Sequence, residues 1–235
     1  MSLFNTAPQA SKSLRVLALM LGYPDAQLCS HLPDMRAALH EERALAAPRL
    51  AELDALIVAL GRKAVLEVEA DYVELFDRGR ATSLHLFEHV HGDSRDRGPA
   101  MIDLTKTYEQ AGLFLGEGEL PDFLPVVLEF ASTLEPRQAR EFLGEMAHIF
   151  NAIFAALQKR ESPYAAVLGA LLELAGEKAS SVEVAADEPI DAVWEEPVVF
   201  DGCSSKGQSR PDQAQPIHIV PRAARPAGSS TGAQQ

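Results

Sequence analysis

The sequence predicts an all-α fold, built as a single compact domain that resembles a helical bundle. Up to Ala179, apolar residues recur almost everywhere at the 3.6-residue spacing of an amphipathic helix. Proline or glycine separates most of these periodic segments from the next one. Neither a run of alternating strand residues nor a glycine-rich turn from strand to helix is present. We therefore expect about nine helices with short connections.

In the first third of the chain, each predicted helix has a recognisable start or stop signal. Ser13 is expected to cap a first helix that ends at Gly22, and Asp34 to cap the second. Pro48 opens a third helix that ends before Gly61. The first helix is apolar on nearly every side, so we expect it to be buried between others. The apolar positions are Leu14, Val16, Leu17 and Met20, then Met35, Ala38, Leu39 and Leu45, then Leu50, Leu53, Ile57 and Leu60.

The same spacing continues through the rest of the predicted domain. Proline stands at or near the start of most of these later helices, where its fixed φ angle and missing N–H group cost nothing. Further helices are expected over 65–76, over 82–91, from Pro99 to Leu115, over 126–134, from Pro136 to Leu157 as one long helix, and from Pro163 through Leu172.

The composition changes after Ala179, which suggests three regions. Residues 1–180 form the expected helical domain. Residues 181–201 contain seven acidic residues and no basic one, and this extension could lie across the domain through Trp194 and Phe200. Residues 202–235 are rich in Gly, Ser, Gln, Pro and Ala, so we expect a disordered tail.

The charge balance limits the kinds of partner. The chain has 34 acidic and 21 basic residues, a net charge of −13, which argues against nucleic-acid binding and favours a basic or amphipathic partner. Because no long apolar run or secretory signal is recognised, we expect a cytoplasmic protein without stable membrane association. The two cysteines, Cys29 and Cys203, are too far apart for a CxxC site or a disulfide framework.

One short motif suggests a metal site. His85, Glu88 and His89 match the H-x-x-E-H pattern of some zinc hydrolases, with His91 as a further nitrogen. Histidines four residues apart share a helix face, and the glutamate could activate a zinc-bound water. No residue stands out as the third ligand on another element. The competing interpretation is a helix whose histidines make ordinary hydrogen bonds, and we favour it.

The charged residues on both sides of this motif form two nearly balanced groups. The first group is Asp77, Arg78 and Arg80, and the second is Asp93, Arg95, Asp96 and Arg97. Arginine pairs well with carboxylates, so the two loops could brace each other. The same guanidinium groups could instead bind the phosphates of a cofactor. We favour bracing, because phosphate-binding arginines usually leave a net positive patch.

A longer stretch carries a family resemblance. LFDRGRATSLHLFEHVHGDSRDRGPAM, residues 75–101, closely resembles the nitrate reductase molybdenum cofactor assembly chaperones, the delta-subunit family among the redox-enzyme maturation chaperones. Residues 119–125, 158–164 and 191–198 extend the resemblance. One departure is Phe123, where the broader family often has histidine.

This resemblance implies a cytoplasmic all-helical chaperone without catalytic activity, and we expect no resident cofactor or metal. It implies binding to the apo catalytic subunit of respiratory nitrate reductase, including its N-terminal segment. The chaperone would hold that subunit competent for molybdenum cofactor insertion and delay membrane docking until insertion is complete.

The client segment is expected to bind in an apolar groove beside residues 75–98 and 121–134. We expect acids such as Glu74, Asp77 and Asp122 on its rim, although the same acids could equally form a solvated or Arg-paired face. The candidate client-binding residues are Glu74, Asp77, Arg78, Arg80, Glu88, His89, His91, Asp93, Arg95, Asp96, Arg97 and Asp122.

Overall fold

The computed structural model describes residues 9–92 and 94–179. Within these ranges the chain forms eleven α-helices, one short 3-10 helix and no strand, which confirms the all-α prediction. The elements in chain order are α1 (Ser11–Leu21), α2 (Ala26–Ser30), α3 (Leu32–Glu42), α4 (Ala47–Arg62), α5 (Val65–Phe76), η1 (Arg80–Thr82), α6 (Leu86–Val90), α7 (Arg97–Gln110), α8 (Leu124–Thr133), α9 (Pro136–Glu145), α10 (Ala147–Lys159) and α11 (Ala165–Ala175).

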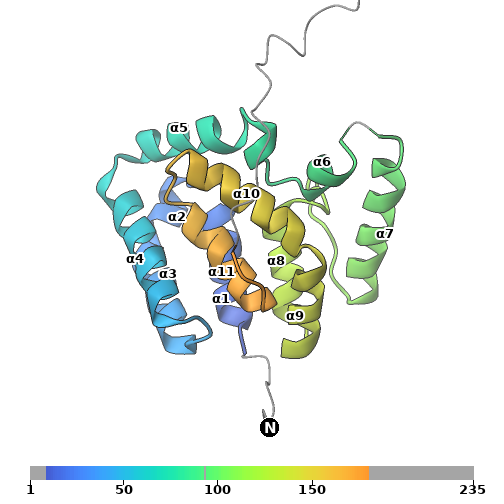
Figure 1. Cartoon of the computed structure of the whole chain (residues 1–235), viewed down its shortest axis with the longest axis horizontal. Helices are drawn as coiled ribbons and strands as arrows, with labels where there is room; N and C mark the ends of the chain where they lie inside the picture. Colours follow the sequence, from blue (N-terminus) through green and yellow to red (C-terminus); the bar gives the residue numbers. More distant parts are fainter. Residues whose placement is uncertain (1–8, 93, 180–235) are drawn as a thin grey trace, which may run out of the picture. The chain divides into compact units, whose positions relative to one another are not determined.

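The core of these residues is built around α11. Nine of its eleven residues are buried, and it packs against α1, α4, α9 and α10 (Figure 1). Helix α1 also packs against α3 and α8. An apolar helix enclosed on several sides needs no polar face, which explains why the α11 sequence is almost entirely Ala, Val, Leu and Gly.

The start of α1 differs from the prediction. Ser13 does not cap this helix, which begins two residues earlier, and its side chain is buried. The carboxylate of Glu42 instead accepts hydrogen bonds from the backbone N–H groups of Lys12 (2.9 Å) and Ser13 (2.6 Å). A side chain at the end of α3 therefore satisfies the free donors of α1. Similarly, α3 begins before Asp34, which lies in its first turn.

The single long helix expected from Pro136 to Leu157 is wrong, because the chain breaks at Met146. This residue has φ −98° and ψ 1°, and it ends α9 and starts α10. Its carbonyl oxygen accepts from the N–H groups of Ile149 (2.9 Å) and Phe150 (3.1 Å). Both helices bury a face against α11, so the apolar spacing continues across the break and conceals it.

Other helix boundaries differ from the sequence prediction for local reasons. The short helix α2 was not expected; Asp25 caps it by accepting from the N–H of Leu28 (2.7 Å). The helix expected from Pro99 to Leu115 is α7, which begins two residues before Pro99 and ends earlier than predicted, at Gln110. Gly112 then adopts φ +80°, and Leu113 N–H turns back to the carbonyl of Tyr108 (2.9 Å), the usual role of glycine after a helix.

The expected acidic extension, 181–201, and the expected tail, 202–235, lie outside the described residues, so that division of the chain stays a prediction. Across the ranges that are described, no helix has both the length and the apolar character needed to cross a membrane.

Candidate functional site

Most of the predicted site residues lie on one excursion of the chain, residues 85–122, which we call the arm. It contains α6 and α7 and stands beside α8 and α10 (Figure 1). Its two ends meet in an isolated antiparallel bridge between His85 and Phe123. Leu86 N–H donates to the carbonyl of Asp122 (3.0 Å), and Leu124 N–H donates to that of Leu84 (2.8 Å). The chain therefore enters and leaves the arm at one point.

Asp122 holds this junction together. Its carboxylate is fully buried, which corrects the expectation that it lies on an exposed acidic rim. Oδ2 accepts a hydrogen bond from Phe87 N–H (3.1 Å) and lies 3.8 Å from Nη2 of Arg97. Oδ1 lies 3.6 Å from Nδ1 of His85. A buried carboxylate needs such partners, so Asp122 acts from beneath the surface by positioning the starts of α6 and α7.

Charged side chains around Asp122 complete a small network. Arg97 also approaches Glu88, with 3.6 Å between Nη2 and Oε1. Pairing with the Asp122 carboxylate raises the pKa of His85 above its ordinary value, although burial acts in the opposite direction. Glu88 and Asp122 belong to neither of the two charged groups, so the expected bracing of one group against the other stays a prediction. The guanidinium of Arg80 lies close to Gly92, just before the second charged group.

The zinc interpretation receives no support from this geometry. His85 precedes α6 with an extended backbone, so it does not share a helix face with His89. Nε2 of His89 lies 2.9 Å from the carbonyl oxygen of Ser83, the ordinary hydrogen bond of the competing interpretation. The described part of the chain contains no group of three or more His, Cys, Asp or Glu residues arranged to hold a metal ion.

The other candidate residues do not gather around one point. Glu74 and Arg78 form an exposed pair within one helix turn (2.7 Å), and Asp77 ends α5. The ring of His91 contacts that of Phe87. Asp93 lies outside the described residues, Arg95 is exposed, and Asp96 precedes α7. Their role in client binding stays a prediction.

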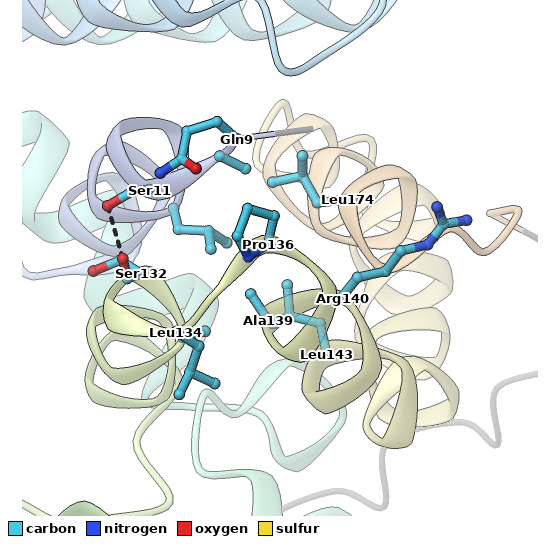
Figure 2. A pocket seen from close by; sticks show the side chains of 12 residues that line it. Gln9, Ser11, Ser132, Leu134, Pro136, Ala139, Arg140, Leu143 and Leu174 are labelled. Carbon is cyan, nitrogen blue, oxygen red and sulfur yellow. Dashed lines mark hydrogen bonds between the residues drawn. The ribbon is translucent and has the colours of Figure 1, made fainter. Parts of the chain in front are cut away.

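Two depressions of the described surface do not match the predicted groove. One, of about 450 Å³, includes Glu74 and Leu75 but no residue of α8. The other, where α1, α8, α9 and α11 meet, has a volume of only about 20 Å³, room for about one water molecule (Figure 2). Ser11 Oγ donates to the carbonyl of Ser132 across its side (2.7 Å). This second depression is too small to hold a peptide.

A larger surface, which we call the α1–α8 trough, shares α8 with the predicted groove, but its pairing with α1 was not predicted. It consists of two depressions of about 560 and 410 Å³ that share Leu19 of α1 and Glu129 of α8. Leu19 is 47% exposed, which corrects the expectation that α1 is buried on all sides. Tyr23 (52%) lines the first depression and Phe114 (79%) the second. The sequence signal that could have indicated the α1 side of this surface is the apolar character of the first helix on nearly every side. Its partner helix, α8, is remote in sequence.

Comparisons with known proteins agree on one family. The model of the nitrate reductase delta subunit family matches residues 38–169. NarJ of Escherichia coli K12, named a nitrate reductase molybdenum cofactor assembly chaperone, is 45% identical over 193 residues, which cover 78% of this chain and 82% of that protein. The NarJ protein of Bacillus subtilis 168 is 33% identical over 158 residues, covering 66% and 84%.

A solved structure shows the same fold. It is described as a redox enzyme maturation protein from Archaeoglobus fulgidus, and it matches 75% of this chain and all of its own with a TM-score of 0.50 and 18% identity.

Proposed function

This chain belongs to the nitrate reductase delta subunit family, and from that premise we propose that it is a chaperone for nitrate reductase maturation. It binds the apo catalytic subunit of respiratory nitrate reductase, including its N-terminal segment. It holds that subunit competent for molybdenum cofactor insertion before the enzyme docks at the membrane. We place this activity in the cytoplasm.

The observation that carries the proposal is the 45% identity, over most of both chains, to a protein named as an assembly chaperone of this enzyme. Because the family members are assembly chaperones, the expectation that the chain is not an enzyme is also confirmed.

Two physical properties suit a helical client segment. The chain carries a net charge of −13, which attracts a basic partner. The described surface also has open apolar depressions between helices, the kind of surface into which an amphipathic helix lays its apolar face.

Calorimetric titration of the full chain with a synthetic peptide tests the proposal. The peptide carries the N-terminal segment of the cognate catalytic subunit, and a scrambled peptide of the same composition is the control. We expect binding of the cognate peptide that weakens from low to high salt. If a folded protein binds neither peptide at either salt concentration, recognition through the N-terminal segment is wrong.

A pull-down with the apo and the cofactor-loaded catalytic subunit tests the chaperone role separately. The chain should retain the apo subunit in preference to the loaded one. Equal retention of both forms would contradict a role that ends with cofactor insertion.

A further inference from the structure

The α1–α8 trough runs along two antiparallel helices. At one end, Nε of Arg15 donates to Oγ of Ser132 (3.1 Å). In the middle, Leu19 and Glu129 line both depressions. At the other end, Gly22 and Pro125 line the same depression. From position 15 to position 22, the trough follows α1 for about 10 Å at the rise of an α-helix.

Three exposed apolar side chains converge on the trough. Leu19, Tyr23 and Phe114 are among the few large apolar side chains that the described residues leave exposed, and all three line it. They come from α1, from the loop after α1 and from the loop after α7. Convergence of exposed apolar side chains from separate segments marks a binding surface more strongly than single exposed residues do.

The charges around this apolar surface are mostly negative. Asp25, Asp34, Glu119 and Glu129 line the trough, against Arg15 and His31. Three of the acids are engaged locally: Asp25 caps α2, Asp34 lies 3.4 Å from His31, and Glu119 accepts from Gly116 N–H. Glu129 is exposed, and its carboxylate has no ion pair among the described residues.

The position of Glu129 defines the chemistry of an occupant. Glu129 lines both depressions, which extend from it in opposite directions along the helix pair, one toward Arg15 and Ser132 and the other toward Gly22 and Pro125. A helix that lies in the trough would match it with a Lys or Arg near the centre and with apolar side chains about one turn away in each direction. A nucleic acid or an acidic helix would place negative charge against Glu129.

We propose that the α1–α8 trough is the docking site of the client segment, bound as an amphipathic helix with a basic residue over Glu129 and apolar residues in the two depressions. This proposal rests on the proposed function, and it assigns the site to α1 and α8 and the loops beside them. The sequence prediction also placed the groove beside residues 121–134, which include α8, but it set residues 75–98 on the other side in place of α1, with acids such as Glu74, Asp77 and Asp122 on the rim.

Titration of full-length variants with the same N-terminal peptide tests this assignment. Glu129→Lys should weaken binding at least about tenfold and reduce its salt dependence, and Leu19→Ala or Phe114→Ser should weaken it about five- to tenfold. The matched controls lie outside the trough: Glu145→Lys and Leu66→Ala, whose parent residues are also exposed. They should bind like the unmodified chain, and circular dichroism confirms that each variant is folded.

Charge exchange separates direct recognition from a structural effect. A peptide whose central Lys or Arg is replaced by Glu should bind the unmodified chain weakly and the Glu129→Lys variant more tightly. A variant damaged only in its fold would not recover in this way.

The outcomes distinguish the site from the function. If the unmodified chain binds the peptide and the three trough variants bind equally well, the trough assignment is wrong while the proposed function stands. Loss of binding in Glu74→Lys, with the trough variants unaffected, would return the groove to the depression beside α5. If the unmodified chain does not bind the peptide, docking of the N-terminal segment fails and the trough proposal fails with it.

Discussion

Helices α11 and α7 have similar lengths but opposite environments. In α11, nine of eleven residues are buried, whereas in α7 only Tyr108 of fourteen residues is buried. The core helix is held by apolar contacts on several sides. The arm that contains α7 is closed on itself by a few specific polar contacts at Asp122 and Tyr108.

This difference implies two levels of stability in one chain. Burial of apolar side chains dominates the stability of the helices around α11. The arm buries little apolar surface, so we expect it to open at a lower free-energy cost than the rest of the fold.

The largest effect is expected in the core. Leu168 of α11 is fully buried, so Leu168→Ala should lower the free energy of unfolding by about 3 kcal/mol in urea denaturation. Amide hydrogen exchange should accelerate in α11 and stay unchanged in the arm, because opening of the arm leaves α11 packed. The control is Ile102→Ala in α7, where the side chain is 57% exposed and the change should stay within about 0.5 kcal/mol.

Equal acceleration of exchange in α11 and in the arm of Leu168→Ala would show that the arm opens only with the whole fold. The two helices would then differ in burial, but the arm would not open separately from the rest of the fold.

A second, smaller effect is expected at the arm junction. Asp122→Ala removes the acceptor of Phe87 N–H and the counter-charge of Arg97, at a cost of about 2 kcal/mol. Limited proteolysis within residues 85–122 should then become about 30-fold faster, because cleavage follows the population of the open arm. Asp122→Asn keeps an oxygen acceptor, so its rate of proteolysis should lie between those of the unmodified chain and Asp122→Ala. Cleavage at the unmodified rate would mean that Asp122 does not secure the arm.

The hydroxyl of Tyr108 contributes less. It donates a buried hydrogen bond to the carbonyl of Pro121 (2.8 Å), and Tyr108→Phe leaves that carbonyl without this partner. The expected cost is about 1 kcal/mol, seen as cleavage of the arm that is about fivefold faster. Tyr108→Phe keeps the ring contact with Phe130, so a much larger effect would point to a role beyond the hydrogen bond.

The smallest effect depends on pH. The pKa of His85 is raised by pairing with Asp122, so its stabilising contribution is fully present below the ordinary histidine pKa of about 6.5 and is lost as the pH rises through the raised value. The charged groups nearest to it are Asp122, Glu88 and Arg97. Urea denaturation across this range should show a decline for the unmodified chain that is smaller in His85→Gln. If the unmodified chain and His85→Gln showed parallel pH profiles, His85 would not contribute to stability through its pairing with Asp122.

The sequence was informative where local chemistry decides structure. Pro48 and Pro136 both stand in the first turns of the helices predicted from them, because the start of a helix depends on its own few residues. The break at Met146 was missed because α9 and α10 pack on the same helix, α11, and share one apolar spacing.

The site was harder to predict because it depends on contacts between distant segments. Asp122 was identified, but its buried position depends on a set of contacts with His85, Phe87 and Arg97 that the local sequence does not reveal. The trough needs α1 beside α8, a pairing across more than a hundred residues. Nothing in the local pattern of Leu19 or Phe114 specifies such a partner.

The bridge between His85 and Phe123 also makes the arrangement of the remaining helices independent of the length of the arm. Because both ends of the arm are fixed to each other by two backbone hydrogen bonds, residues can be added or removed between α6 and α8 without changing the distance that the chain must cover from α5 to α8. Lengthening such a closed segment costs only loop-closure entropy, about 0.6 kcal/mol for each doubling. The arm is therefore the part of this fold in which insertions, deletions and grafted sequences should be tolerated best.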